Sequence, residues 1–162
     1  MQLSQTYNKK IYAVISNMSI AAERRDLLQK FSCVICNQLE AGIFFADDYS
    51  QKTPEELKDI ISNKVMSSQL PAMVVTMGSQ GSVYAEDNGN KGICPAKKIH
   101  VKDTTGAGDS FCAGVVIGLT YGKDLPGAIE IGTSLAASVI TSSENVCPRF
   151  QPRELGLDID VK

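Results

Sequence analysis

The chain has 162 residues, of which 43% are hydrophobic and 21% are charged. This composition is typical of a folded globular domain and excludes a disordered, collagen-like or coiled-coil chain. Sixteen basic and eighteen acidic side chains give a net charge of −2, without the basic excess of a nucleic-acid-binding protein, and no apolar run is long enough to span a membrane. We therefore expect a single domain over residues 1–162 with no nucleic-acid or membrane partner.

Cysteine usage and the first residues predict the cellular compartment. The five cysteines are an odd number at irregular spacing, which is typical of reduced thiols. Residues 1–10 are polar and lack the apolar core of a signal peptide. On these grounds we expect a cytoplasmic protein.

The first half of the chain alternates between predicted strands and helices. In chain order we expect a strand at residues 10–15, a helix at 20–31 capped by Ser19, a strand at 32–36, a helix at 38–45 and a polar loop at 46–52. The next helix begins with the capping-box spacing of Thr53 and Glu56, with Pro54 in its first turn. The apolar stripe of this helix is expected to comprise Leu57, Ile60, Ile61, Val65 and Met66.

The second half begins with an apolar strand at residues 73–78, and a strand without polar alternation suits a parallel sheet covered on both faces. The later elements are, in order, short strands at 82–86 and 93–97 around a turn at 87–90, a glycine-rich loop at 103–109, and helices at 107–121 and 125–142. Gly122 is placed to end the first of these helices. The alternation predicts an α/β fold with a mostly parallel, Rossmann-like sheet in a three-layer αβα arrangement.

Ligands of such sheets bind beyond the carboxyl ends of the strands. Three predicted loops lie at such ends: the loop after Cys36, the loop after Met77, and residues 103–109. We therefore search these loops for chemistry.

The most informative segment is Asp103-Thr104-Thr105-Gly106-Ala107-Gly108-Asp109-Ser110-Phe111. Its glycines leave the backbone bare where an apolar helix begins, and the first amides of a helix have no intrahelical partner, so they attract a phosphate. Asp109 would repel that phosphate, which makes sense if it is a general base that takes the proton of an attacking hydroxyl. The local residues fit equally well a glycine-rich turn in which Asp109 only complements the helix dipole.

Two other phosphate-binding glycine motifs do not fit. Phe111 stands where the dinucleotide-binding pattern needs its third glycine. Residues 118–124 have one residue too few for a Walker A loop and end in Asp124 instead of Ser or Thr. The sequence therefore offers no P-loop.

The segment around Asp109, with Ala113-Gly114 after it, closely resembles the signature of the ribokinase-like carbohydrate kinases, the phosphofructokinase-B family. Asn37-Gln38-Leu39-Glu40 resembles the family's Asn-x-x-Glu motif, and Thr76-Met77-Gly78-Ser79-Gln80-Gly81 resembles its Thr-x-Gly-x-x-Gly turn. The resemblance runs from about residue 10 to residue 152. Residues 17–19 and 143–146 look somewhat like pseudouridine-kinase-type members.

The resemblance implies an enzyme that transfers a phosphoryl group from ATP to a hydroxyl of a sugar or nucleoside. Asp109 would be the catalytic base. The amides of Gly106, Ala107 and Gly108 would stabilise charge on the transferring phosphoryl group. Further residues would border the nucleotide, namely Thr76, Gly78, Ser79, Gly81 and Thr104.

The resemblance also implies metal ions. Asn37 and Glu40 would help hold Mg²⁺ and the phosphates, through water. Asp103 and the carbonyl of Thr105 match a monovalent-cation site, for K⁺, which residues 143–145 would complete. The helix 128–139, rich in small residues, would flank the adenine.

Other candidate residues have simpler interpretations. Cys33 and Cys36 lie three residues apart on a strand and should point to opposite faces, so with a single histidine in the chain we expect buried thiols and no zinc site. The basic segment 97–102 could attract a polyanion, but a solvated strand face is the interpretation we favour. Without the resemblance, Asn37 and Glu40 would be an ordinary strand end and helix start.

Length is at odds with the resemblance, because the chain matches only the second half of a ribokinase-like fold. It would carry the nucleotide site and the catalytic base. The N-terminal half of the fold and the lid, which contact the sugar, would be missing. A half sheet exposes a strand edge, so we expect pairing with the missing half or self-association through the side formed by residues 10–15. Two functions stay open: the catalytic half of a sugar or nucleoside kinase, nearly inactive alone, and a non-catalytic nucleotide-binding or interaction module that retains the loop.

Overall fold

The computed structural model describes residues 2–15, 23–142 and 151–157, and the chain forms two compact units, Met1–Pro95 and Ala96–Lys162. The first unit contains the sheet, and the second contains the glycine-rich loop with the last two long helices. Within the described residues, no helix is long and apolar enough to cross a membrane. The single domain expected over residues 1–162 stays a prediction, and each unit is described by itself.

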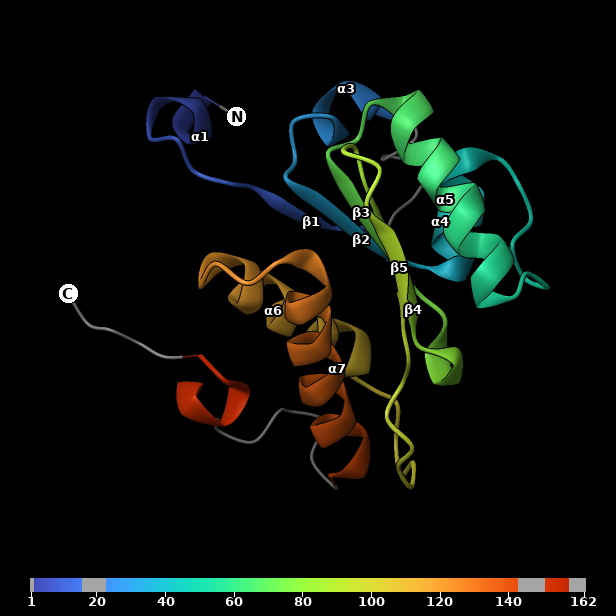
Figure 1. Cartoon of the computed structure of the whole chain (residues 1–162), viewed down its shortest axis with the longest axis vertical. Coiled ribbons are helices and arrows are strands. Elements are labelled where there is room, and N and C mark those ends of the chain that lie inside the picture. The colour runs from blue at the N-terminus through green and yellow to red at the C-terminus, as the bar shows by residue number, and fades with distance from the viewer. Residues whose placement is uncertain (1, 16–22, 143–150, 158–162) are drawn as a thin grey trace. The chain divides into compact units, whose positions relative to one another are not determined.

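The first unit is built on a five-stranded sheet (Figure 1). Its strands, in spatial and chain order, are β1 (Tyr12–Val14), β2 (Cys33–Asn37), β3 (Ala72–Thr76), β4 (Ser82–Glu86) and β5 (Lys91–Cys94). β2 is parallel to both β1 and β3, whereas β4 is antiparallel to both β3 and β5. Four of the five strands therefore point in one direction, and the predicted α/β fold with a mostly parallel sheet is confirmed.

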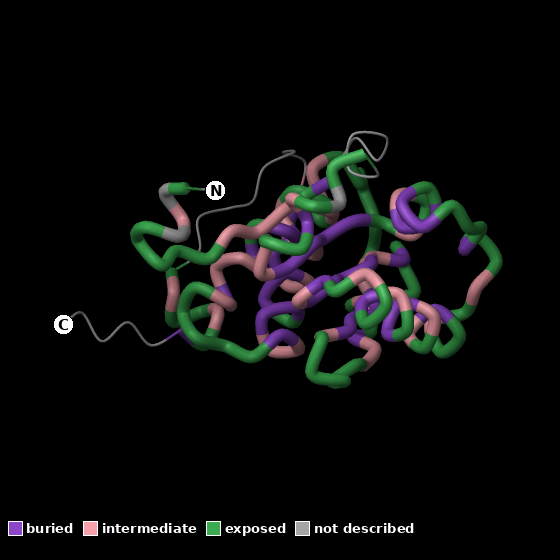
Figure 2. Tube along the Cα trace, turned by 90° about the horizontal axis from the view of Figure 1, so that it is seen from above, coloured by how far each residue is buried: buried purple, intermediate pink, exposed green. Residues whose placement is uncertain are grey.

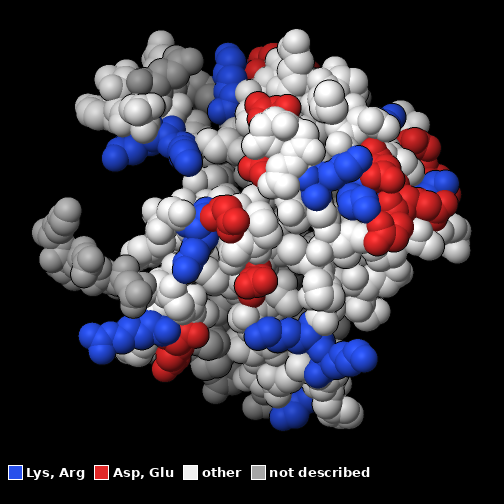
Figure 3. All heavy atoms as spheres, viewed as in Figure 1, with Lys and Arg blue, Asp and Glu red and all other residues white. Residues whose placement is uncertain are grey.

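The helices of the first unit are α1 (Gln2–Thr6), α3 (Arg25–Leu28), α4 (Gln38–Phe45) and α5 (Pro54–Ser68). α4 packs on β2 and β3, and α5 packs on β3, β4 and β5. Acidic and basic side chains lie together over α5 in Figure 3, where Lys58 pairs with Glu55 and Lys91 pairs with Asp59. The surface of α5 thus carries mixed charge.

The start of α5 is the predicted capping box. The amide of Glu56 donates to Thr53 Oγ1 (3.3 Å), and the amide of Thr53 donates to the Glu56 carboxylate (2.9 Å). The helix buries Leu57, Ile61 and Val65, which recur every four residues. The expectation for Met66 is wrong, because it lies one position beyond Val65, is turned away from the buried face and is 59% exposed.

The core of the first unit lies between the sheet and its helices. Alternate residues of β2 and β3 enter this core, while Ile35 and Val74 on the opposite face are also fully buried. Figure 2 shows the buried stretches of the trace in purple. Burial on both faces explains why these strands are apolar throughout. The core includes Val34, Cys36, Met73, Val75, Val83, Ala85, Phe44, Phe45, Tyr49, Leu57, Ile61 and Val65.

The second unit contains α6 (Ala107–Thr120), α7 (Leu125–Thr141) and a short 3₁₀ helix, η2 (Pro152–Leu155). α6 and α7 approach so closely that only glycine fits at their contact. A Cβ atom on Gly114 would lie 2.6 Å from Gly132 Cα, and a Cβ atom on Gly132 would lie 2.6 Å from the carbonyl oxygen of Phe111. Gly122, in the left-handed conformation (φ 80°), ends α6 as predicted.

Three expectations for the elements were partly wrong. β5 begins at Lys91 and not at residue 93, because the amide of Glu86 donates to Asn90 across a tight turn and the strand resumes at once. β1 is limited to three residues. Of the helix expected at 20–31, α3 covers Arg25–Leu28, residues 24 and 29–30 form turns, and Ser19 lies outside the described residues.

Candidate functional site

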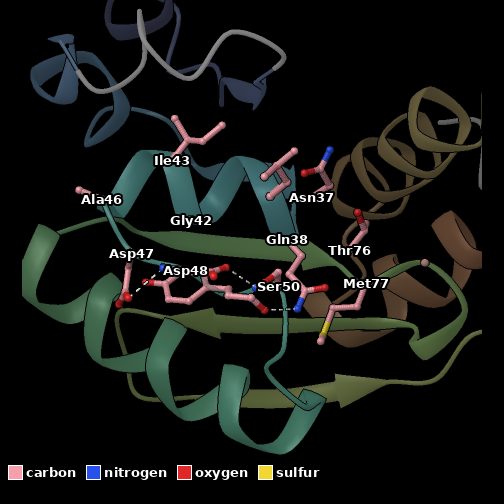
Figure 4. Close-up of a pocket in the computed structure, with 13 residues that line it drawn as sticks. Asn37, Gln38, Gly42, Ile43, Ala46, Asp47, Asp48, Ser50, Thr76 and Met77 are labelled. Carbon is pink, nitrogen blue, oxygen red and sulfur yellow. Dashed lines mark hydrogen bonds between the residues drawn. The ribbon is translucent and has the colours of Figure 1, made fainter.

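Two of the predicted ligand-binding loops start side by side. β2 and β3 pair in parallel with Asn37 opposite Thr76, so both residues stand at the carboxyl ends of neighbouring strands. The Thr76 hydroxyl donates to the carbonyl oxygen of Cys36 (3.5 Å), and Figure 4 shows Asn37 and Thr76 at the same end of α4. Both loops therefore begin at the carboxyl ends of strands, where ligands of such sheets bind.

Asn37 and Glu40 form a capping box at the start of α4. Asn37 Oδ1 accepts from the amide of Glu40 (2.8 Å), and Glu40 Oε2 accepts from the amide of Asn37 (2.7 Å). The simpler interpretation, in which Asn37 ends a strand and Glu40 lies at a helix start, therefore accounts for Asn37 Oδ1 and Glu40 Oε2. Among the described residues, Asn37 Nδ2 and Glu40 Oε1 have no hydrogen-bond partner, so a ligand role would fall to them.

The turn after β3 has glycine at Gly78 and Gly81, so its backbone is not covered by side chains at these positions. Residues Gly78–Gln80 form a single 3₁₀ turn, η1, in which Gly78 has a φ of 57° and Gly81 has a φ of 92°. The amide of Met77 donates to the carbonyl oxygen of Gly81 (2.8 Å) and closes the turn, and Ser79 is exposed on it. A Cβ atom on Gly78 would meet nothing within 4 Å, so its outer side is open to a ligand.

A cavity of about 1040 Å³ adjoins these residues (Figure 4). α4, the loop 46–52 and the end of β3 form its wall, which, within the described part of the chain, includes Asp47 and Asp48 but no lysine, arginine or histidine. Sequence reasoning missed the contribution of α4 and of this loop. Gly42 was a usable signal, because a Cβ atom there would lie 2.7 Å from the carbonyl oxygen of Asp47, so the loop can fold back on the helix only over a glycine.

The glycine-rich loop of the second unit leads directly into α6. Gly106 is the N-cap residue of α6 and has a φ of 78°, a conformation that glycine adopts without strain. Among the described residues, the amides of Gly106, Gly108 and Asp109 have no backbone acceptor. The Ala107 amide was expected to stabilise charge on the phosphoryl group, but it already donates to the carbonyl oxygen of Thr104 (3.2 Å). This expectation therefore needs correction.

The first turn of α6 combines free donors with a carboxylate. Asp109 is exposed in this turn. Upstream, Asp103 Oδ1 accepts from both the amide and the hydroxyl of Thr105 (2.8 Å each), and these bonds lower the pKa of Asp103. Asp103 thus organises the loop with one oxygen, and the expected K⁺ site would depend on the other oxygen and on residues 143–145, which lie outside the described residues.

Other predicted features of the second unit have packing explanations. The small residues Ala128 and Gly132 of α7 lie against α6, so the expected adenine contact stays a prediction. The basic segment 97–102 is solvated as expected but is not a strand. It runs beside α7, since the Lys97 ammonium donates to Ser134 Oγ (2.9 Å) and the amide of Lys102 donates to the carbonyl of Ile140 (3.0 Å).

No group of three or more His, Cys, Asp or Glu side chains gathers within the described part of the chain. Mg²⁺ does not require such a group, because it keeps much of its water and is held by one or two protein oxygens together with phosphates. In the first unit, Glu40 Oε1 fits that mode of binding, because it is a carboxylate oxygen without a hydrogen-bond partner among the described residues.

Comparison with known proteins decides the family. Residues 3–147 match the model of the pfkB family carbohydrate kinases. The chain belongs to this family. It is 37% identical over 136 residues to the guanosine-inosine kinase of Exiguobacterium acetylicum, a match that covers 83% of the chain and 44% of that enzyme.

Solved structures of pfkB-type kinases share the fold. The chain matches Arabidopsis thaliana ribokinase, complexed with ribose and ATP, with a TM-score of 0.76 at 18% identity, over 88% of the chain and 45% of the ribokinase. It matches Thermotoga maritima ribokinase with a TM-score of 0.71 at 21% identity, over 96% of the chain and 50% of that protein. The chain has a ribokinase-like fold and spans about half the length of these relatives.

Tyr49 in the cavity wall predicts a pH dependence of stability. Its side chain is 1% exposed, and burial, followed by the charge of Asp47, raises its pKa to about 12. The pKa of Tyr49 in the folded chain exceeds its unfolded value of about 10. The contribution of Tyr49 to the free energy of unfolding is therefore complete below about pH 10 and is lost as pH rises toward about 12. Urea unfolding across this range should show a smaller loss of unfolding free energy in Tyr49→Phe than in the wild type.

Tyr7→Phe is the matched control, since Tyr7 is 65% exposed. It should follow the wild type throughout the alkaline range. An equal alkaline loss in the wild type and in Tyr49→Phe would contradict the assignment.

Proposed function

We propose that this chain is the nucleotide-binding and catalytic half of a kinase that transfers a phosphoryl group from ATP to a hydroxyl of a sugar or nucleoside. In this proposal the chain corresponds to the C-terminal half of the ribokinase-like fold, and the remainder of the kinase supplies the acceptor site. The observation that carries the proposal is the start of α6, where the amides of Gly106, Gly108 and Asp109 lack backbone acceptors next to an exposed carboxylate.

These residues can perform two parts of a phosphoryl transfer. Asp109 would accept the proton of the acceptor hydroxyl as its oxygen attacks phosphorus. The amides of Gly106 and Gly108 would stabilise the charge on the phosphoryl oxygens, and such preorganised donors are typically worth about 3 kcal/mol of barrier. The helix dipole of α6 acts in the same sense.

The chemistry of the first unit supports a metal-bound nucleotide. Among the described residues, the wall of the cavity beside Asn37, Thr76 and Gly78 has no cationic side chain that could offset the charge of ATP phosphates. Mg²⁺ would supply that charge, with Asn37 and Glu40 as its protein-side contacts through water. We expect ATP to bind this chain far more tightly with Mg²⁺ than without it.

The alternative is a non-catalytic nucleotide-binding or interaction module. Both functions predict binding of ATP, but only the kinase predicts that Asp109 controls turnover.

Asp109→Asn tests the kinase in a protein that joins this chain to the rest of the fold. Removal of the base should lower kcat by about 10²–10⁴-fold with little change in the affinity for ATP, because Asn keeps the shape but cannot accept the proton. The matched control is Asp124→Asn, which keeps the cap of α7, where Asp124 Oδ1 accepts from the amide of Gly127 (3.0 Å). A near-normal kcat in Asp109→Asn would refute the role of Asp109 as base.

Self-association of the isolated chain is a second expectation. β1 lies at one end of the order of strands, pairs with β2 alone among the described residues, and exposes 54% of Val14. An open strand edge with an exposed β-branched residue favours pairing with the remainder of the fold or with a second copy.

Sedimentation over a range of concentrations should show that the mean mass of the isolated chain rises with concentration. Val14→Lys should reduce this rise, since a charge on the edge opposes strand pairing. A strictly monomeric wild type at high concentration would count against the expectation.

A further inference from the structure

Gln38 makes contacts that no motif accounts for. It is the first residue of α4 and stands at one of the two unspecified positions of the Asn-x-x-Glu motif, between Asn37 and Glu40. Its side-chain amide, half-buried, donates to the carbonyl oxygen of Tyr49 and to that of Lys52 (3.4 Å). In Figure 4 the side chain points from α4 toward the loop that carries Asp48 and Ser50. Gln38 therefore joins the start of α4 to a loop more than ten residues further along the chain.

Besides Gln38, the loop 46–52 is held by the buried side chain of Tyr49 and by backbone hydrogen bonds. The amide of Asp47 donates to Gly42 (2.9 Å) at one end, and the amide of Lys52 donates to Tyr49 (3.0 Å) at the other. The carbonyl of Tyr49 thus accepts from both Lys52 and Gln38. Gln38 is the contact that connects the second end of the loop to the helix that begins at the cavity.

α4 is held on the core by Ala41, Phe44 and Phe45, while the bonds of Gln38 anchor its first turn. It has eight residues with Gly42 in its middle, and short helices that contain glycine are marginal without tertiary contacts. The capping box of Asn37 and Glu40 is local and cannot anchor the helix end to another segment. The two bonds of Gln38 supply an anchor at the point where the helix meets Thr76 and the cavity.

We propose that Gln38 is a positioning residue, which holds the loop 46–52 against the start of α4 and so fixes Asn37 and Glu40 for a bound nucleotide. The claim that Gln38 fixes Asn37 and Glu40 for a nucleotide rests on the proposed function. The claim that Gln38 holds the loop 46–52 rests on its hydrogen bonds alone, so the two claims can fail separately.

The test compares Gln38→Met with Gln29→Met in the full chain. Methionine keeps the length of the side chain and loses the donor. Gln29 is a matched control, because its side-chain amide also donates to a distant backbone carbonyl, that of Ser68 (3.1 Å), and it lies outside the wall of the large cavity. Two readouts are measured: hydrogen exchange of individual amides, and the affinity for ATP with Mg²⁺.

Gln38→Met should raise the exchange rates of the Lys52 and Glu40 amides about tenfold and weaken ATP binding by a similar factor, the size expected when two neutral hydrogen bonds are lost. Exchange of β3 amides should not change, since the effect is local. Gln29→Met should leave the Lys52 and Glu40 amides and the affinity unchanged. This pattern would support the inference.

Three other results overturn part of it. Unchanged exchange at Lys52 and Glu40 in Gln38→Met refutes the anchor, whether or not ATP binds. Faster exchange with unchanged ATP affinity refutes the positioning role. Faster exchange in a chain whose wild type binds no ATP supports the anchor and refutes the proposed function instead.

Discussion

Among the described residues, a few backbone amides at the start of α6 have no backbone acceptor, and the proposed binding of phosphate depends on them. Gly106 makes this possible, because its φ of 78° turns the chain into the helix at an angle that other residues adopt only with strain. Gly114 and Gly132 then let α6 lie directly on α7, which fixes the direction of the helix and of its first amides. Glycines far apart in the sequence thus serve one purpose, the placement of donors and of Asp109 at a rigid helix end.

In the first unit, strand pairing and not helix packing places the candidate ligand-binding residues. Parallel pairing of β2 and β3 places Asn37 and Thr76 together, and left-handed glycines keep the turn after β3 open. Among the described residues, the wall of the cavity beside them includes Asp47, Asp48 and neutral polar and apolar side chains but no lysine, arginine or histidine. In our proposal, backbone amides and a bound metal ion carry the recognition of phosphate.

Local signals in the sequence predicted much of this structure. The bounds of α4 and β4 match the expected ones, and α6 and α7 each end one residue earlier than expected, because caps and turn glycines lie within a few residues of the ends that they define. Contacts between distant residues were not predictable in this way. The bond from Gln38 to Lys52, the packing of Ala128 against α6 and the fold-back of the loop over Gly42 depend on tertiary structure.

The most direct test of the central claim follows individual amides by NMR as ATP and Mg²⁺ are added to the chain. The account predicts that the resonances of Gly106, Gly108 and Asp109 shift with a common dissociation constant and that Gly106→Ala weakens this binding. Gly122→Ala is the matched control, since Gly122 has nearly the same φ (80°) at the opposite end of α6. If these amides stay unchanged while the nucleotide binds elsewhere, or if both alanine variants behave alike, the claim is contradicted.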